Sequence, residues 1–148
     1  MKTILLFLGF FTLLSSCEND EVESNFQATE LIFTDVGSGS LYGDEGIQQS
    51  NLVLNNQTEW QNLLTQVNAV SPVSDNFEET TIDFESYTVI AVFLEIKPTS
   101  WGIEITSVFE NENDILVSNE ETEGDATILS QPFHIVKIPK TTKDIVFE

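Results

Sequence analysis

The chain has 148 residues, of which 41% are hydrophobic and 20% are charged, and its formal net charge is −20. This length suits one domain with one sizeable core. The strong negative charge repels phosphates and argues against binding of nucleic acids or anionic lipid headgroups. A single Cys excludes a disulfide within the chain, and one His beside it is too few for a zinc site. We expect neither a metal ion nor a cofactor.

The first seventeen residues predict a lipoprotein signal. Met1-Lys2 is followed by an apolar run that is too short to span a bilayer comfortably. The segment Leu14-Ser15-Ser16-Cys17 then resembles the bacterial lipobox, which implies cleavage after residue 16 and acylation of Cys17. Two or three acyl chains hold a protein stably on a membrane. An ordinary secretory signal with an incidental Cys is the alternative.

An acidic segment follows the predicted cleavage site. Residues 18–23 are acidic and polar, and we assign residues 17–28 to the lipidated Cys and a disordered tether. Acidic residues directly after a lipidated Cys are similar to an export tag for the outer face of the outer membrane, although a solvated linker explains them equally well. Cleavage removes Lys2 and no acid, which makes the charge more negative by one unit. We expect an outer-membrane lipoprotein of the cell envelope, with its domain on either the external or the periplasmic face.

The centre of the remaining sequence, residues 29–148, is a stretch that is apolar on both faces. Residues 87–96 do not alternate between apolar and polar, so they predict a strand that is covered on both sides. The next strand does alternate, with Ile103, Ile105 and Phe109 on its inner face, and we expect it to pair with the first. A corner at residues 98–102 joins the two strands.

One amphipathic helix is predicted at residues 59–68. Its apolar stripe comprises Trp60, Leu63, Leu64 and Val67. Thr58 and Gln61 have the spacing of a capping box, and Ser71-Pro72 ends the segment. The stripe supplies a cover for one face of the central strand.

Several short strands complete the predicted fold. They fall at residues 31–36, 51–54, 115–117, 127–129, 133–139 and 144–147, with a glycine-rich loop at 37–40. Seven or eight short strands with one helix predict an α+β domain that is mainly antiparallel, built as a sheet or sandwich.

Few residues offer catalytic chemistry. His134 alternates with Val136 and Ile138 and is expected to pack in the core, with a role as a general base as the alternative. A Ser-His-Asp triad would assemble from distant positions, but the sequence has no Gly-x-Ser-x-Gly elbow to support one. The acids at 110–114 suggest a calcium loop or a solvated turn, and they lack the usual ligand spacing. We therefore expect no enzymatic activity.

The corner between the two central strands is the best candidate for a binding site. Loops on a rigid sheet carry many binding residues, and Trp is common at interaction hot spots. The candidates for partner binding are Pro98, Thr99, Ser100, Trp101 and Gly102. In the alternative interpretation, Trp101 folds back and covers the core.

The order of several motifs resembles the PrcB C-terminal domain family over about residues 57–147. The motifs are Glu59-Trp60, Phe84 with Tyr87, Val89 to Leu94, Lys97-Pro98-Thr99, Ile103-Glu104-Ile105, and the run from Pro132 to Lys140. The resemblance implies a lipoprotein subunit of a surface protease complex that binds and stabilises a subtilisin-like protease. It implies a protein-binding or accessory module.

The chain departs from the family at the corner. Family members follow Pro-Thr with two glycines and an aromatic residue, whereas Ser100-Trp101-Gly102 stands here and the corner is one residue shorter. A different corner implies a different partner. The corner is also similar, more loosely, to the inhibitory loops of chagasin-like cysteine protease inhibitors. The alternatives to an accessory module are therefore an inhibitor that presents residues 98–102, or a lipoprotein that binds a small ligand.

Overall fold

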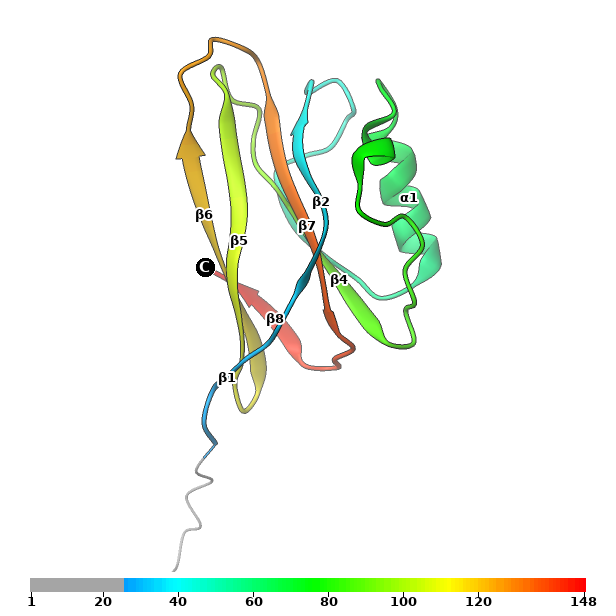
Figure 1. The fold of residues 1–148 in the computed structure, drawn as a ribbon, viewed down its shortest axis with the longest axis vertical. Coiled ribbons are helices and arrows are strands. Elements are labelled where there is room, and N and C mark those ends of the chain that lie inside the picture. The colour runs from blue at the N-terminus through cyan, green and yellow to red at the C-terminus, as the bar shows by residue number, and fades with distance from the viewer. Residues whose placement is uncertain (1–25) are drawn as a thin grey trace, which may run out of the picture.

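The computed structural model describes residues 26–148, which form two four-stranded sheets and a single α-helix (Figure 1). The predicted α+β fold, mainly of antiparallel strands, is thereby confirmed. The predicted signal peptide, Cys17 and most of the predicted tether lie outside the described residues. In the described part of the chain, no helix is long and apolar enough to cross a membrane.

The chain passes several times between the two sheets. The strands are β1 (Thr29–Glu30), β2 (Thr34–Leu41), β3 (Ser50–Leu54), β4 (Tyr87–Phe93), β5 (Trp101–Glu110), β6 (Asp114–Glu123), β7 (Gln131–Pro139) and β8 (Asp144–Phe147). The helix α1 spans Gln57–Val67, and a short 3-10 helix, η1, spans Val73–Asn76. The first sheet has the order β1-β5-β6-β8 and the second the order β2-β7-β4-β3. Only the β6–β8 pair is parallel.

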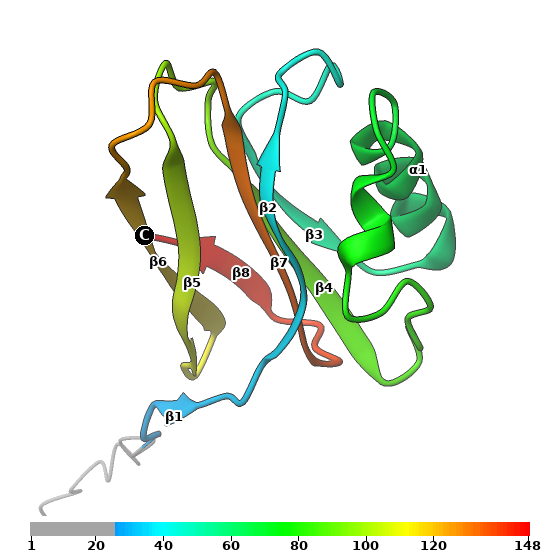
Figure 2. The ribbon, with the colours of Figure 1, turned by 45° about the horizontal axis from the view of Figure 1, so that its top comes forward.

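The second sheet lies between the first sheet and the helix (Figure 2). Val89, Ala91 and Phe93 of β4 pack in a core cluster with the apolar stripe of α1. Ile90 and Val92 pack in another cluster with the apolar residues of β5 and β6. The prediction of a central strand covered on both faces is confirmed.

The predicted pairing of the two central strands is wrong, because β4 and β5 belong to different sheets. Both edges of β4 are occupied, one by β3 and the other by β7. The chain therefore uses residues 94–100 to cross from the second sheet to the first, where β5 pairs with β1 and β6. Alternation within a strand indicates which face is buried, but it does not identify the neighbour.

The inner face of β5 also differs from the prediction at its C-terminal end. Ile103 and Ile105 are buried as expected, but the next buried residue is Val108, and Phe109 is only half-buried. The register with β6 shifts between Ile105 and Ser107. A bulge adds one residue to a strand and so moves the following side chains to the opposite face.

Two further predictions about strands are wrong. Residues 37–40 form part of β2, where the predicted loop would lie, and residues 127–129 are irregular where a strand is predicted. A glycine in a strand leaves room for a close approach of another group. At Gly37 that room is filled by the ring of Phe77, whose Cδ1 lies 2.4 Å from the position that a Cβ would take.

The helix begins two residues earlier than predicted and has a different cap. The Asn56 side chain accepts a hydrogen bond from the Glu59 backbone N–H at 3.0 Å. The Glu59 carboxylate accepts one from the Asn55 backbone N–H at 2.8 Å. Asn56 and Glu59 therefore cap the helix by satisfying the Glu59 amide and the amide of Asn55 just before the helix, and the predicted cap of Thr58 with Gln61 is wrong. The stripe of Trp60, Leu63, Leu64 and Val67 is buried as predicted.

We expect Gly37→Ala to lower the free energy of unfolding by about 1–3 kcal/mol, because the new methyl group would collide with the Phe77 ring. In a Phe77→Ala background the same substitution should have a much smaller effect. Urea-induced unfolding of the two single variants and the double variant measures the difference. An equal loss in both backgrounds would contradict the close approach.

Candidate functional site

Three connections meet at the end of the molecule opposite β1. They are residues 42–49, 94–100 and 124–130, and together with the adjoining start of β5 we call them the loop pole (Figures 1 and 2). The loop pole and β1, the first strand of the described chain, therefore lie at opposite ends of the fold (Figures 1 and 2). Loops on a rigid β scaffold are frequent sites of binding.

The predicted corner lies in the loop pole, and its residues differ in exposure. Pro98 and Gly102 are exposed, whereas Thr99, Ser100 and Trp101 are half-buried. The Trp101 Nε1–H donates a hydrogen bond to Thr99 Oγ1 at 2.8 Å. Trp101 belongs to neither of the two core clusters, so it does not cover the core as the alternative interpretation required.

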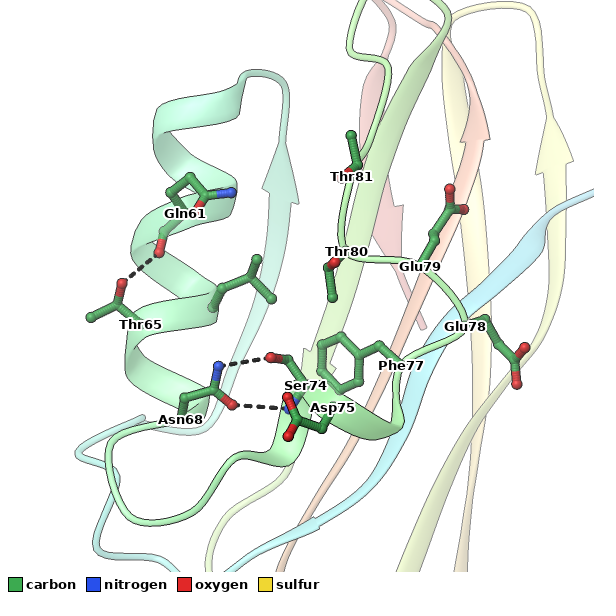
Figure 3. Close-up of a pocket in the computed structure, with 11 residues that line it drawn as sticks. Gln61, Thr65, Asn68, Ser74, Asp75, Phe77, Glu78, Glu79, Thr80 and Thr81 are labelled. Carbon is green, nitrogen blue, oxygen red and sulfur yellow. Dashed lines mark hydrogen bonds between the residues drawn. The ribbon is translucent and has the colours of Figure 1, made fainter.

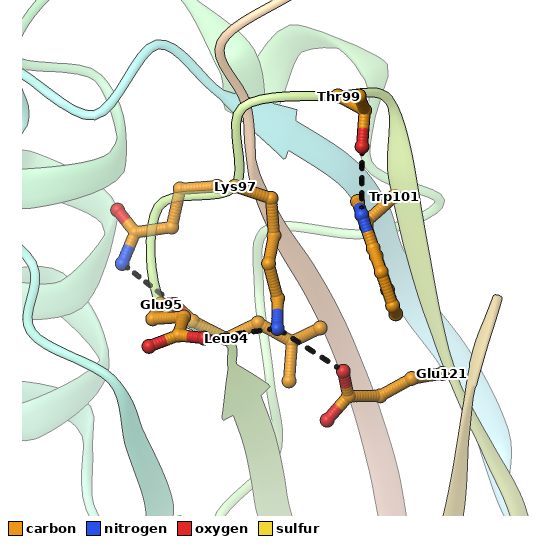
Figure 4. Close-up of polar contacts among 7 residues, drawn as sticks. Leu94, Glu95, Lys97, Thr99, Trp101 and Glu121 are labelled. Carbon is orange, nitrogen blue, oxygen red and sulfur yellow. Dashed lines mark hydrogen bonds and ion pairs between the residues drawn. The ribbon is translucent and has the colours of Figure 1, made fainter. Parts of the chain in front are cut away.

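Lys97 holds the indole of Trp101 in place. Its ammonium group lies 4.6 Å from the ring centroid and pairs with the carboxylates of Glu95 at 3.0 Å and Glu121 at 3.4 Å (Figure 4). The hydrogen bond to Glu95 is the main cause that raises the pKa of Lys97 above 10.5, and the charge of Glu121 adds to it. A raised pKa means that the contribution of these ion pairs to stability is present below pH 10.5 and is lost only as the pH rises further.

Backbone hydrogen bonds fix the corner to the loop 124–130. Lys97 and Ser130 exchange both backbone hydrogen bonds, at 2.7 and 3.0 Å. The Ser100 N–H donates to the Ala126 carbonyl at 2.8 Å, and Ser100 Oγ accepts from the Ala126 N–H at 3.1 Å. These bonds make the corner and its neighbouring loop one ordered unit.

A buried glutamine joins the third loop to the same unit. The Nε2 group of Gln131 donates to the Ile47 carbonyl at 2.9 Å and to the Leu94 carbonyl at 3.0 Å. Within residues 42–49, the Glu45 carboxylate accepts hydrogen bonds from the backbone N–H groups of Tyr42 and Gly43. The three loops of the pole are therefore held relative to one another by hydrogen bonds.

Large apolar side chains are exposed on the loop pole. Ile128 and Leu129 are 55% and 58% exposed, and Tyr42 and Ile96 are exposed on the adjoining loops. The bridge between Lys97 and Ser130 brings Leu129 beside the corner. Contiguous exposed apolar side chains on a folded domain mark interaction sites. Sequence reasoning missed these four residues, since residues 127–129 were predicted as a strand and nothing in the sequence indicated that the three loops meet.

Acidic side chains occur on the loops of the pole and on the adjoining end of β6. They are Asp44, Glu95, Glu121, Glu123 and Asp125, and Lys97 is the only basic residue of the three loops. Because Lys97 is already paired with two of these carboxylates, the loop pole keeps a negative charge. The loop pole thus combines exposed apolar side chains with acidic ones.

His134 lies away from the loop pole, between the two sheets. It is buried on the same face of β7 as Val136 and Ile138, as predicted. Its Nδ1 accepts a hydrogen bond from the Ile105 backbone N–H at 2.7 Å, so the ring proton is on Nε2, which donates to Asp35 at 3.1 Å. Both ring nitrogens are already used to connect β5, β7 and β2. A cavity of about 220 Å³ adjoins this ring.

The acidic turn at 110–114 closes on itself. Asn111 Nδ2 donates to the Asp114 carboxylate at 2.8 Å, and the Asn111 N–H donates to the Asp114 carbonyl at 2.9 Å. Among residues 26–148, no group of three or more His, Cys, Asp or Glu side chains is placed to hold a metal ion. The two hydrogen bonds between Asn111 and Asp114 therefore account for the conformation of this turn.

No family model, curated protein or solved structure matches the chain. The resemblance to the PrcB C-terminal domain family therefore stays a prediction from the sequence motifs.

We expect His134→Leu to destabilise the domain by about 1–3 kcal/mol, because the buried Ile105 N–H would lose its acceptor. Asp35→Asn keeps an oxygen that can accept from Nε2, and the Asp35 side chain is 65% exposed, so its effect should stay below about 1 kcal/mol. Chemical denaturation of the two variants measures both effects. A larger loss from Asp35→Asn than from His134→Leu would contradict this account.

Proposed function

We propose that the protein is a lipid-anchored module of the cell envelope that binds a protein partner through the loop pole. The observation that carries the proposal is the set of exposed apolar side chains on the three loops. Figure 1 shows these loops at the end of the fold opposite β1. An anchor attached through the N-terminal segment would hold β1 towards the membrane. The loop pole would then face away from the membrane, where a partner can reach it.

The order of the loop pole supports binding by a preformed surface. The corner is fixed to the loop 124–130 by Lys97 and Ser100, and Gln131 connects the remaining loop. Surfaces that are ordered before binding lose less conformational entropy when a complex forms. The loops can therefore bind without folding at the interface.

The charge of the loop pole defines the chemistry of the partner. A surface that combines apolar and acidic side chains complements a protein surface that combines apolar side chains with Lys or Arg. The formal net charge of −20 extends this attraction to long range and raises the association rate with basic partners. Binding through such a surface weakens as the salt concentration rises, because its charges are screened.

A protease is the partner class that the sequence resemblance implies. A stabilising subunit would bind the protease without blocking it, whereas an inhibitor would present residues 98–102 to the active site. The exposure of Pro98 and the fixed position of Ser100 favour the inhibitor as the second candidate, since inhibitory loops are exposed and rigid. Slowing of a purified protease by the protein would separate inhibition from stabilisation.

We expect Ile128→Asp to abolish capture of a specific partner from mildly crosslinked envelopes by tagged full-length protein, with mass spectrometry as the readout. Ile32→Asp is the matched control, because Ile32 is 88% exposed and lies in the connection between β1 and β2, at the opposite end from the loop pole. Trp101→Ala should also weaken capture, since it removes the ring that Lys97 covers. Neither Asp substitution should lower the melting temperature by more than a few degrees.

Equal capture by the Ile128→Asp and Ile32→Asp variants would contradict a role for the loop pole. A partner that is lost from both variants would place the binding surface elsewhere. A large fall in melting temperature for Trp101→Ala with unchanged capture would assign Trp101 to stability alone.

We expect Cys17→Ala to leave the protein without acyl chains and to move it from the detergent phase to the aqueous phase in a phase-separation assay. The predicted lipobox identifies the sulfur of Cys17 as an atom that is acylated. Metabolic labelling with a fatty-acid analogue gives an independent readout. A Cys17→Ala variant that still enters the detergent phase would contradict the anchor.

A further inference from the structure

A groove lies between α1 and residues 74–81, apart from the loop pole (Figure 3). Its volume is about 630 Å³, within the range of sites that bind small molecules. Gln61, Thr65 and Asn68 of the helix form one wall, and the segment that contains Phe77 and Thr80 forms the other (Figure 3). The groove runs along the helix and is open to solvent between these two walls.

Several polar groups of the groove have no partner in the described chain. The Gln61 amide, the Asp75 carboxylate and the hydroxyls of Thr80 and Thr81 make no hydrogen bond or ion pair among residues 26–148. By contrast, the Asn68 amide is occupied by Ser74 at both its nitrogen and its oxygen. The free groups include a donor and acceptor amide, two hydroxyls and one anionic acceptor.

The same groove has an apolar surface of fixed orientation. Leu64 and Phe77 line it between the polar walls. The Phe77 ring packs against Trp60 with centroids 6.4 Å apart and against Phe133 with centroids 5.9 Å apart. Because both neighbours are fully buried, the ring is held in place before any ligand arrives. An aromatic ring beside free amide and hydroxyl groups suits a ligand with both C–H and hydroxyl surfaces.

We infer that this groove binds a neutral saccharide. An anionic ligand is disfavoured because Asp75, Glu78 and Glu79 all line the groove and only Glu79 is paired with a lysine, Lys137. A purely apolar ligand would bury the free polar groups without partners, which is unfavourable. A saccharide offers hydroxyls that both donate and accept, together with C–H faces that pack on an aromatic ring. The inference concerns a second site, and it does not depend on binding at the loop pole.

The test is isothermal titration calorimetry of the full-length protein in a detergent without a sugar headgroup. The probes are cellotriose, maltotriose and chitotriose. We expect at least one of them to bind with one ligand per chain and a Kd of about 0.1–1 mM. Gln61→Ala and Asp75→Ala should each weaken that binding by about tenfold, because each removes one hydrogen-bonding group. Gln66→Ala is the matched control, since Gln66 is exposed on the same helix outside the groove.

The inference is overturned if none of the three probes binds at about 10 mM, a concentration at which a millimolar site would be nearly saturated. It is also overturned if Gln66→Ala weakens binding as much as Gln61→Ala, because the ligand would then lie elsewhere. Binding of trilysine with no binding of a saccharide would assign the groove to cationic ligands. The Ile128→Asp variant should bind the saccharide normally, which separates this site from the loop pole.

Discussion

The structure depends on one sheet that is apolar on both faces. β4 and β7 carry apolar residues on both faces of the sheet, so neither face is stable in contact with water. Each face must therefore be buried by a further layer of the fold. The helix supplies one layer with a stripe centred on Trp60, and the first sheet supplies the other with β5 and β6. The other elements are placed by this requirement, including the crossing at residues 94–100 that carries the chain from the middle layer to the outer one.

Local patterns predicted the parts of the fold that depend on local physics. The two apolar faces of residues 87–96 and the helical stripe were both visible in the sequence, because burial repeats with the period of each element. The sequence did not reveal three other features: the partner of β4, the bulge after Ile105 and the strand through Gly37. Each depends on a distant residue: β7 occupies the edge of β4, and the ring of Phe77 fills the space above Gly37. A single sequence contains no local signal for such contacts.

In the candidate sites, too, some residues could be predicted from the sequence and others could not. The corner at residues 98–102 was predictable because a Trp between two strands stands out in the sequence. Its neighbours Ile128 and Leu129 were not, since they reach the corner only through the bridge between Lys97 and Ser130. The groove beside α1 was missed for a related reason. Its walls come from a helix and from a segment that the sequence describes only as acidic, and they become a cavity when Phe77 packs between Trp60 and Phe133.

The way the chain enters the domain determines how it would carry a mechanical load. A force applied at the N-terminal end first meets β1, which pairs with β5 over only two residues. It then reaches β2, which runs along the molecule and pairs with β7 from Thr34 to Leu41 (Figure 1). Hydrogen bonds between strands are perpendicular to the strands, so a pull along β2 loads its bonds together in shear. Peeling of β1 would thus leave the middle sheet intact and lengthen the segment that precedes it.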